Sequence, residues 1–324
     1  MGRILVTRRL PDGGLGPLAG HTLVDPKPDD APFTHDELCD IAPQCDAIVC
    51  LLTDRIDAAV LRAGAAGSLR VVANVAVGYD NVDVAAAHEC GVTVCNTPGV
   101  LDETTADLAF ALILAASRLA GDAERDLRAG RWPGWGITQY LGRDVHGATL
   151  GIVGYGRIGR AVARRAAGFD MRVLHHARHD TGVDGYVADL DTLLAESDIV
   201  TLHVPGGADT HHLVDERRLG LMKPTAVLVN TARGPVVDEA ALAAALHDGR
   251  IFAAGLDVFE HEPLVHPDLL TAPRTVLLPH LGSASDATRR RMATMATSAV
   301  ATVLSGGTPP NVIAPGPEPY DPRS

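Results

Sequence analysis

The stretch that decides the fold runs from Gly151 to Asp180, GIVGYGRIGRAVARRAAGFDMRVLHHARHD. An apolar run leads into three glycines, Gly154, Gly156 and Gly159, and an Arg-rich, Ala-rich segment typical of a helix follows them. In a strand–turn–helix unit these glycines permit a tight turn, a close approach of backbone to a pyrophosphate, and close packing of helix on strand. The helix N-terminus adds a favourable site for negative charge. A second apolar run, MRVLHH, follows where the next strand belongs, so the stretch predicts a dinucleotide-binding βαβ unit.

The adenosine end of this predicted site lacks the acidic residue that usually binds the ribose. Ala177 stands at the end of the second apolar run, Arg178 and His179 come next, and Asp180 comes later than expected. Without a carboxylate there is no repulsion of a 2′-phosphate, and a guanidinium can pair with that phosphate through two N–H groups. We therefore expect Arg178 and His179 at the adenosine ribose and NADP(H) as the cofactor. The alternative is NAD(H), with Asp180 on the ribose and Arg178 solvated.

Composition excludes several other classes of protein. The chain has 324 residues, 46% of them hydrophobic, and a net charge of −12. This length suits two domains, and the negative charge disfavours nucleic-acid and anionic membrane surfaces as partners. No apolar run is long enough for a signal peptide or a membrane span. The five cysteines show no CxxC spacing, which favours thiols in a reducing compartment; we expect a cytoplasmic protein.

Apolar runs alternate with helical segments along the chain, which predicts parallel sheets with crossover helices. The expected strands are RILVT, DAIVCLL, RVVANV and VTVCN, and in a second series ATLGIVG, MRVLHH, DIVTLHVP, AVLVNTA, FAAGLDV and TVLLPH. Long helices are expected over TPGVLDETTADLAFALILAASRLA and SDATRRRMATMATSAVATVL. RAGRWPGWGITQYLGRD, with Trp132 and Trp135, is expected to be an irregular linker, and the Pro-rich tail from Ser305 an extended arm or frayed end. Because the glycine-rich turn lies mid-chain, we expect a cofactor domain at residues 100–285 inserted into a substrate domain formed by 1–99 and 286–324.

Three polar side chains follow strands of the second series. Arg233 ends AVLVNTARG, Glu262 lies in FAAGLDVFEHEP, and His280 ends TVLLPH. Ligands of open parallel sheets bind beyond the carboxyl ends of the strands. Reduction of a 2-keto acid needs a proton on the carbonyl oxygen, which histidine can hold when a carboxylate orients it, and an arginine to bind the substrate carboxylate. Taken alone, Arg233 is more simply a surface ion pair, Glu262 a loop carboxylate and His280 a turn residue. Together with the glycine-rich turn they predict a catalytic set.

Several ordered motifs together resemble the D-isomer-specific 2-hydroxyacid dehydrogenase family. They are GYGRIG, VNTARG, GLDVFEHEP and LPHLGSA, with NVAVGYDNVD and LDETTADLA in the first part of the chain. The closest likeness is to the glyoxylate/hydroxypyruvate reductase branch. The resemblance implies an α/β fold of two doubly wound parallel sheets, a Rossmann cofactor domain inserted into a flavodoxin-like substrate domain, and a homodimer. It also implies His280 as proton donor, Glu262 as its partner and Arg233 as the substrate-binding arginine.

The same resemblance implies further contacts with cofactor and substrate. The backbone around Val77 and Gly78 would receive the substrate carboxylate. Thr105 would lie by the nicotinamide and Asp257 would contact its carboxamide. The remaining expected cofactor contacts are Arg157 and Ile158 at the pyrophosphate, and His203, Val204, Thr231 and Ala232 along the cleft.

Other functions fit the sequence less well. The histidine pairs His175–His176 and His211–His212 come without HExxH or a Cys/His ladder, so we expect no metal site. LGSAS does not match the GxSxG elbow of serine hydrolases. A nucleotide-sensing corepressor on the same fold would not need a proton donor, formate-type oxidation would not need an acid–carboxylate pair, and a larger phosphoglycerate dehydrogenase would carry a further regulatory domain. NAD-dependent 2-hydroxyacid oxidation and phosphite oxidation share much of the set and stay open as alternatives.

Overall fold

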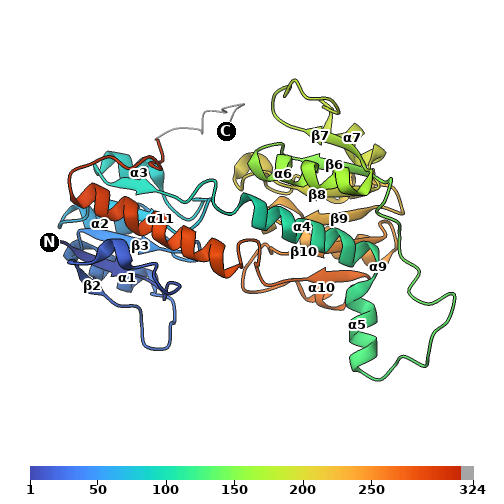
Figure 1. Ribbon diagram of the computed structural model, residues 1–324, viewed down its shortest axis with the longest axis horizontal. Coiled ribbons are helices and arrows are strands. Elements are labelled where there is room, and N and C mark those ends of the chain that lie inside the picture. Colours follow the sequence, from blue (N-terminus) through green and yellow to red (C-terminus); the bar gives the residue numbers. More distant parts are fainter. Residues whose placement is uncertain (315–324) are drawn as a thin grey trace. The chain divides into compact units, whose positions relative to one another are not determined.

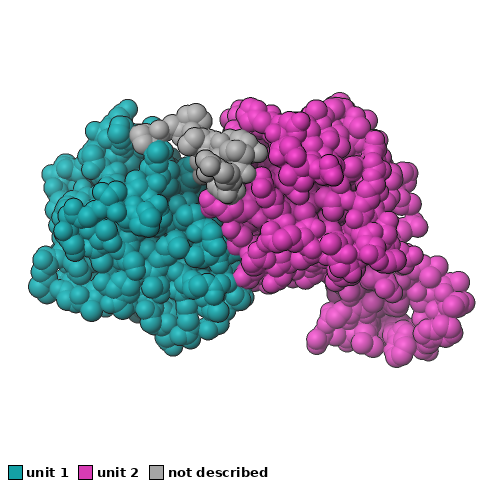
Figure 2. All heavy atoms as spheres, turned by 45° about the horizontal axis from the view of Figure 1, so that its top comes forward, with its two compact units in different colours: residues 1–101, 283–320 teal, residues 102–282, 321–324 magenta. Residues whose placement is uncertain are grey.

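The computed structural model describes residues 1–314, which separate into two compact units (Figures 1 and 2). The first unit combines Met1–Leu101 with the segment that begins at Ser283, and the second unit is Asp102–Gly282. The chain therefore leaves the first unit, builds the second unit completely, and returns.

The first unit is built on a five-stranded parallel sheet in the order β2-β1-β3-β4-β5, the order of flavodoxin-like folds. Its strands are β1 (Arg3–Val6), β2 (Thr22–Val24), β3 (Ala47–Cys50), β4 (Val71–Asn74) and β5 (Thr93–Cys95). Its helices are α1 (His35–Ile41), α2 (Ala58–Ala65), α3 (Val84–Glu89) and α11 (Asp286–Leu304). Apolar residues of α1, α2 and α3 form one core with the sheet, while α11 packs against β3, β4 and β5.

The second unit is built on a six-stranded parallel sheet in the order β11-β10-β9-β8-β6-β7. Its strands are β6 (Thr149–Val153), β7 (Arg172–His176), β8 (Ile199–Leu202), β9 (Val227–Asn230), β10 (Ala253–Leu256) and β11 (Thr275–Leu277). Tyr186 forms an isolated parallel bridge with His175 of β7. With that bridge counted as a remnant strand, the order is 3-2-1-4-5-6-7, which contains the usual Rossmann order.

Helices cover both faces of this second sheet, as doubly wound folds require. One core joins the sheet to α4 (Asp102–Ser117) and α6 (Arg157–Ala166). The other joins it to α7 (Leu190–Glu196), α8 (Glu216–Leu219), α9 (Glu239–His247) and α10 (Pro267–Thr271). The two-domain α/β fold expected from the sequence is thus confirmed.

The structure departs from the sequence-based expectations at three places. The helix expected through residue 120 ends at Ser117, and a second helix, α5 (Ala120–Arg128), starts after Leu119, whose φ is +54°. The short edge strand β2 was not expected. The described part of the tail is not frayed, because Val312 bridges Cys95 and the amide of Ile313 donates to Val94; the rest of the expected arm lies outside the described residues.

Candidate active site

The turn after β6 has the geometry that the three glycines predict. Gly154 has a φ of +94°, and a Cβ there would come within 2.6 Å of the backbone of His203. A Cβ on Gly159 would come within 2.2 Å of the carbonyl oxygen of Gly154, so only glycine lets α6 pack this close to β6. A Cβ on Gly156, by contrast, would meet nothing within 4 Å. The turn is therefore tight toward the protein and open at the helix N-terminus.

This open helix end fits the pyrophosphate of a dinucleotide. Within residues 1–314 no side chain caps the N-terminus of α6, so its first amides are available to an anion. Arg157 is exposed and Ile158 half-buried in the first turn. The hydroxyl of Thr231, at the end of β9, is buried and has no hydrogen-bond partner in the described chain; with Ala232 it lies along the same carboxyl edge of the sheet.

His203 and Val204 follow β8, beside the glycine turn. The ring of His203 bonds through Nε2 to the hydroxyl of Thr201 at 2.9 Å. Burial lowers the pKa of His203 to about 3, so the ring is neutral at physiological pH. His203 therefore adds no positive charge to the expected cofactor contacts.

The end of β7 presents cations to solvent. Arg178 and His179 are exposed, and Arg178 forms no ion pair with any described residue. Asp180 is also exposed, and its Oδ1 accepts a hydrogen bond from the amide of Gly182 at 2.9 Å. Beneath this loop the buried ring of His175 bonds to the hydroxyl of Thr181 at 2.6 Å. These two hydrogen bonds hold Asp180 and Thr181 in place, while Arg178 is exposed to solvent.

His280 and Glu262 form a hydrogen-bonded pair. Nδ1 of His280 lies 2.8 Å from Oε2 of Glu262, and the amide of Phe259 donates to Oε1 of Glu262 at 3.1 Å. Burial raises the pKa of the Glu262 carboxyl, but the hydrogen bond and charge of His280, the Phe259 amide and the charge of Arg233 outweigh it, and the pKa lies below its usual value. Glu262 is thus a carboxylate that holds the imidazole of His280 through Nδ1.

The loop that carries His280 is held from behind by two buried side chains. Asp257 accepts hydrogen bonds from the amides of Leu281 and Gly282 at 2.6 and 2.8 Å, and its backbone carbonyl accepts from the amide of His280. Burial raises the pKa of Asp257, although those amides and the charge of His280 oppose the rise. The hydroxyl of Thr105 donates to the carbonyl of Gly282 at 3.1 Å. Both residues were expected to face the cofactor, and what the structure shows is that both hold the His280 loop.

Arg233 extends from a loop shaped by Asn230. The side chain of Asn230 accepts from the amide of Ala232 and donates to the carbonyl of Arg233, at 3.0 and 2.9 Å. At Gly234 a Cβ would come within 1.8 Å of the carbonyl carbon of Phe259. Arg233, Glu262 and His280 thus follow the carboxyl ends of three adjacent parallel strands, β9, β10 and β11. The structure brings these three predicted residues to one edge of the second unit.

Asparagines organise the loop around Val77 and Gly78 in the first unit. Asn74 donates to the carbonyl of Gly78 at 2.9 Å, Asn96 donates to the carbonyl of Val77 at 2.8 Å, and Asn81 bonds to Asn74. Within residues 1–314 the amides of Val77 and Gly78 donate to no acceptor. A loop whose carbonyls are occupied and whose amides are open suits an anion. Sequence reasoning missed these asparagines, although NVAVGYDN contains two of them.

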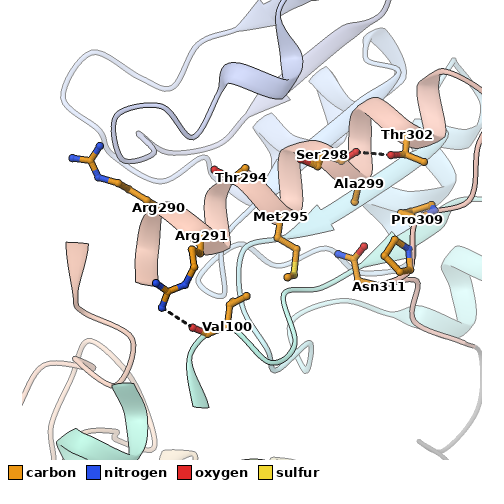
Figure 3. Close-up of a pocket in the computed structure, with 11 residues that line it drawn as sticks. Val100, Arg290, Arg291, Thr294, Met295, Ser298, Ala299, Thr302, Pro309 and Asn311 are labelled. Atoms are coloured by element: carbon orange, nitrogen blue, oxygen red, sulfur yellow. Dashed lines mark hydrogen bonds between the residues drawn. The ribbon is translucent and has the colours of Figure 1, made fainter. Parts of the chain in front are cut away.

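A groove of about 450 Å³ lies along α11 in the first unit (Figure 3). Its walls are mostly apolar, from Val100, Met295, Ala299 and Pro309 among others, and its charged side chains are Arg290 and Arg291. It contains none of the residues expected to act in catalysis. No group of three or more metal-ligating side chains occurs in the part of the chain that the structure describes.

None of the helices in residues 1–314 is, by itself, long and apolar enough to cross a membrane. One pair, α4 with α5, reaches the required length and composition only when taken together across a bend of 68°.

Comparison with known proteins identifies the family. A family model described as the NAD-binding domain of D-isomer-specific 2-hydroxyacid dehydrogenases matches residues 110–282. The chain belongs to the D-isomer-specific 2-hydroxyacid dehydrogenase family. A glyoxylate reductase of Korarchaeum cryptofilum is 50% identical over 96% of this chain and 95% of that protein, and one of Thermococcus onnurineus is 43% identical over the same shares. The chain is thus a nicotinamide-dependent oxidoreductase of the glyoxylate reductase branch, as its motifs predicted.

Solved structures of this dehydrogenase family agree with the fold. An NADPH-dependent glyoxylate/hydroxypyruvate reductase of Sinorhizobium meliloti, crystallised with NADP and malonate, is 35% identical with a TM-score of 0.83, over 96% of each chain. A glyoxylate reductase from Paecilomyes thermophila is 34% identical with a TM-score of 0.85, over 96% of this chain and 98% of that chain.

Proposed function

We propose that this dehydrogenase reduces glyoxylate, hydroxypyruvate or a related small 2-keto acid with NADPH, and gives the D-2-hydroxy acid where the product is chiral. The observation that carries the proposal is the 2.8 Å hydrogen bond between His280 and Glu262, at the same sheet edge as the glycine turn. The names of the glyoxylate reductases that it resembles support the substrate class.

In this proposal residues 102–282 bind the dinucleotide, which supplies the hydride when bound. Protonated His280 gives its Nε2 proton to the carbonyl oxygen, while Glu262 stabilises the imidazolium through Nδ1. Arg233 binds the substrate carboxylate and polarises the carbonyl. In the first unit, the open amides of Val77 and Gly78 are the proposed binding site for a carboxylate group. Arg178 pairs with the 2′-phosphate of NADPH.

A panel of 2-keto acids assayed with NADPH and NADH tests this proposal. We expect the highest kcat/KM for a two- or three-carbon 2-keto acid with NADPH, and chiral chromatography should identify the D product of hydroxypyruvate. Activity confined to NADH would refute the cofactor assignment. Phosphite oxidation without keto-acid reduction would favour the alternative activity that the sequence left open.

We further propose that the chain is a homodimer that buries residues 127–141. Large apolar side chains are exposed there, with Trp135 81%, Ile137 75% and Leu141 64% accessible. Such a cluster is typical of an interaction surface. Sedimentation should give a dimer for the native chain, and the double substitution Trp135→Ser, Ile137→Ser should shift it toward monomers; an unchanged sedimentation coefficient would contradict this surface.

A further inference from the structure

Glu239 is a buried carboxylate that the mechanism above does not use. It is the first residue of α9, it is 4% exposed, and the N-cap of the helix is a different residue, Asp238. Capping therefore does not explain why a carboxylate is buried here. A charge in such a place is costly unless its oxygens are hydrogen-bonded.

Both oxygens of Glu239 bind the loop that carries Glu262. Oε1 accepts from the amide of Glu260 at 2.6 Å, and Oε2 accepts from the amide of His266 at 3.1 Å. These two amides lie on either side of Glu262 in the chain. One carboxylate thus clamps both ends of the segment from which the partner of His280 projects.

Besides the clamp, the segment is held by Val265, which packs against the core, and by the hydrogen bonds of the Glu262 side chain to the Phe259 amide and to His280. Its residues 261–264 are exposed, and its internal backbone hydrogen bond runs from the amide of Leu264 to the carbonyl of His261. Hydrogen bonds to an ionised acceptor are about twice as strong as neutral ones. A catalytic pair needs its geometry fixed within about 0.5 Å, and in this exposed turn the two hydrogen bonds of Glu239 add to the constraint on Glu262.

We propose that Glu239 is a positioning residue that sets the Glu262–His280 hydrogen bond, so that its removal weakens proton delivery without weakening cofactor binding. This inference rests on the proposed function. Glu239→Gln is the direct test, because the amide keeps one acceptor but turns an NH₂ group toward the second backbone N–H. Glu239→Asp keeps the charge but is too short to reach both amides.

The expected result for Glu239→Gln is a fall in kcat of about tenfold or more and a shift of the upper limb of the pH–rate profile to lower pH, with the Kd of NADPH within twofold. A matched control is Glu216→Gln. Glu216 is also the first residue of a helix with an aspartate N-cap, but its side chain pairs with Arg250 on the surface. The control should keep both kcat and the pH profile.

Measuring the effect of Glu239→Gln in the Glu262→Gln enzyme distinguishes an effect through Glu262 from a general loss of structure. If Glu239 acts through Glu262, Glu239→Gln should lower kcat there by less than about threefold. An equal loss in both backgrounds, or an unmoved pH limb, would overturn the inference. If Glu239→Gln does not fold, Glu239→Asp takes its place in these assays. Hydrogen exchange at the amides of residues 260 and 266 in the native enzyme gives a second test, because rapid exchange there would contradict the clamp. If Glu262→Gln alone leaves kcat unchanged, the proposed function itself fails.

Discussion

His280 is the residue on which the proposed chemistry depends most. It has a φ of +55°, a conformation that few non-glycine residues adopt and that is often found at functional sites. Its amide bonds to Asp257 and its ring to Glu262. The backbone conformation is therefore fixed from one side and the ring from the other.

Replacing His280 with Ala removes the proposed proton donor. We expect kcat for glyoxylate reduction to fall by about 10²- to 10⁴-fold, and fluorescence titration should find the Kd of NADPH unchanged. His247→Ala, which removes an exposed histidine of α9 bonded only weakly to Asp268, is the control and should stay fully active. A His280→Ala enzyme of near-native rate would rule out the proton-donor role.

At the other end of the cofactor, Arg178→Ala removes the cation proposed to pair with the 2′-phosphate. Loss of a charge-assisted pair should raise the KM for NADPH by about tenfold or more and leave that for NADH unchanged. The control is Arg172→Ala. Arg172 is the first residue of β7, the strand that Arg178 follows, and it pairs with Glu196, so its removal should alter neither KM. If the KM for NADPH is the same in the native enzyme and in Arg178→Ala, Arg178 does not bind the 2′-phosphate, and NAD(H) becomes the favoured cofactor.

At the scale of secondary-structure elements, two glycines of the turn between β6 and α6 have different roles, one in cofactor binding and one in the stability of the fold. Gly156 and Gly159 belong to one motif, yet a Cβ at the first meets open space and at the second meets the carbonyl oxygen of Gly154 at 2.2 Å. The same substitution should therefore have different consequences at the two positions.

Gly156→Ala is expected to fold normally and to bind NADPH more weakly, since its methyl group projects where the pyrophosphate is proposed to lie. Gly159→Ala should lower the free energy of unfolding by about 1–3 kcal/mol, because helix and strand must move apart. Urea unfolding and cofactor titration measure the two effects. Equal losses of stability in both variants would contradict this division.

The elements also show what sequence can and cannot predict. Strands β6 to β11 were predicted because each is a strongly apolar run, whereas β2 has three residues, none of them fully buried, and gives no such signal. Arg233, Glu262 and His280 were predicted because each follows a strand within a recognisable motif. Glu239 was not, because an acid at the start of a helix is expected from local structure alone. Its partners lie 21 and 27 residues away, and only the fold brings them together.

At the scale of the whole molecule, buried neutral histidines make the fold sensitive to acid. The pKa of His203 is about 3 in the folded chain and about 6.5 when unfolded. Below pH 6.5 the unfolded state therefore binds more protons, and stability falls as pH falls toward 3. His175, whose pKa burial and the nearby charge of Arg160 also lower, contributes in the same direction.

We expect the loss of unfolding free energy between pH 6.5 and pH 5 to include about 2 kcal/mol from His203. His203→Gln, which can keep a hydrogen bond to Thr201, should reduce that loss, as measured by urea unfolding at the two pH values. An identical loss in the native chain and the variant would show that His203 stays protonated or becomes exposed in the fold.

The central claim is that Glu262 and His280 act as one proton-delivering pair, and the pH dependence of kcat/KM for glyoxylate reduction tests it most directly. In the native enzyme the rate should fall as the imidazolium loses its proton at high pH. Because the proposed role of Glu262 is to stabilise the imidazolium, Glu262→Gln should move that fall to lower pH. A Glu262→Gln profile that coincides with the native profile would contradict the claim.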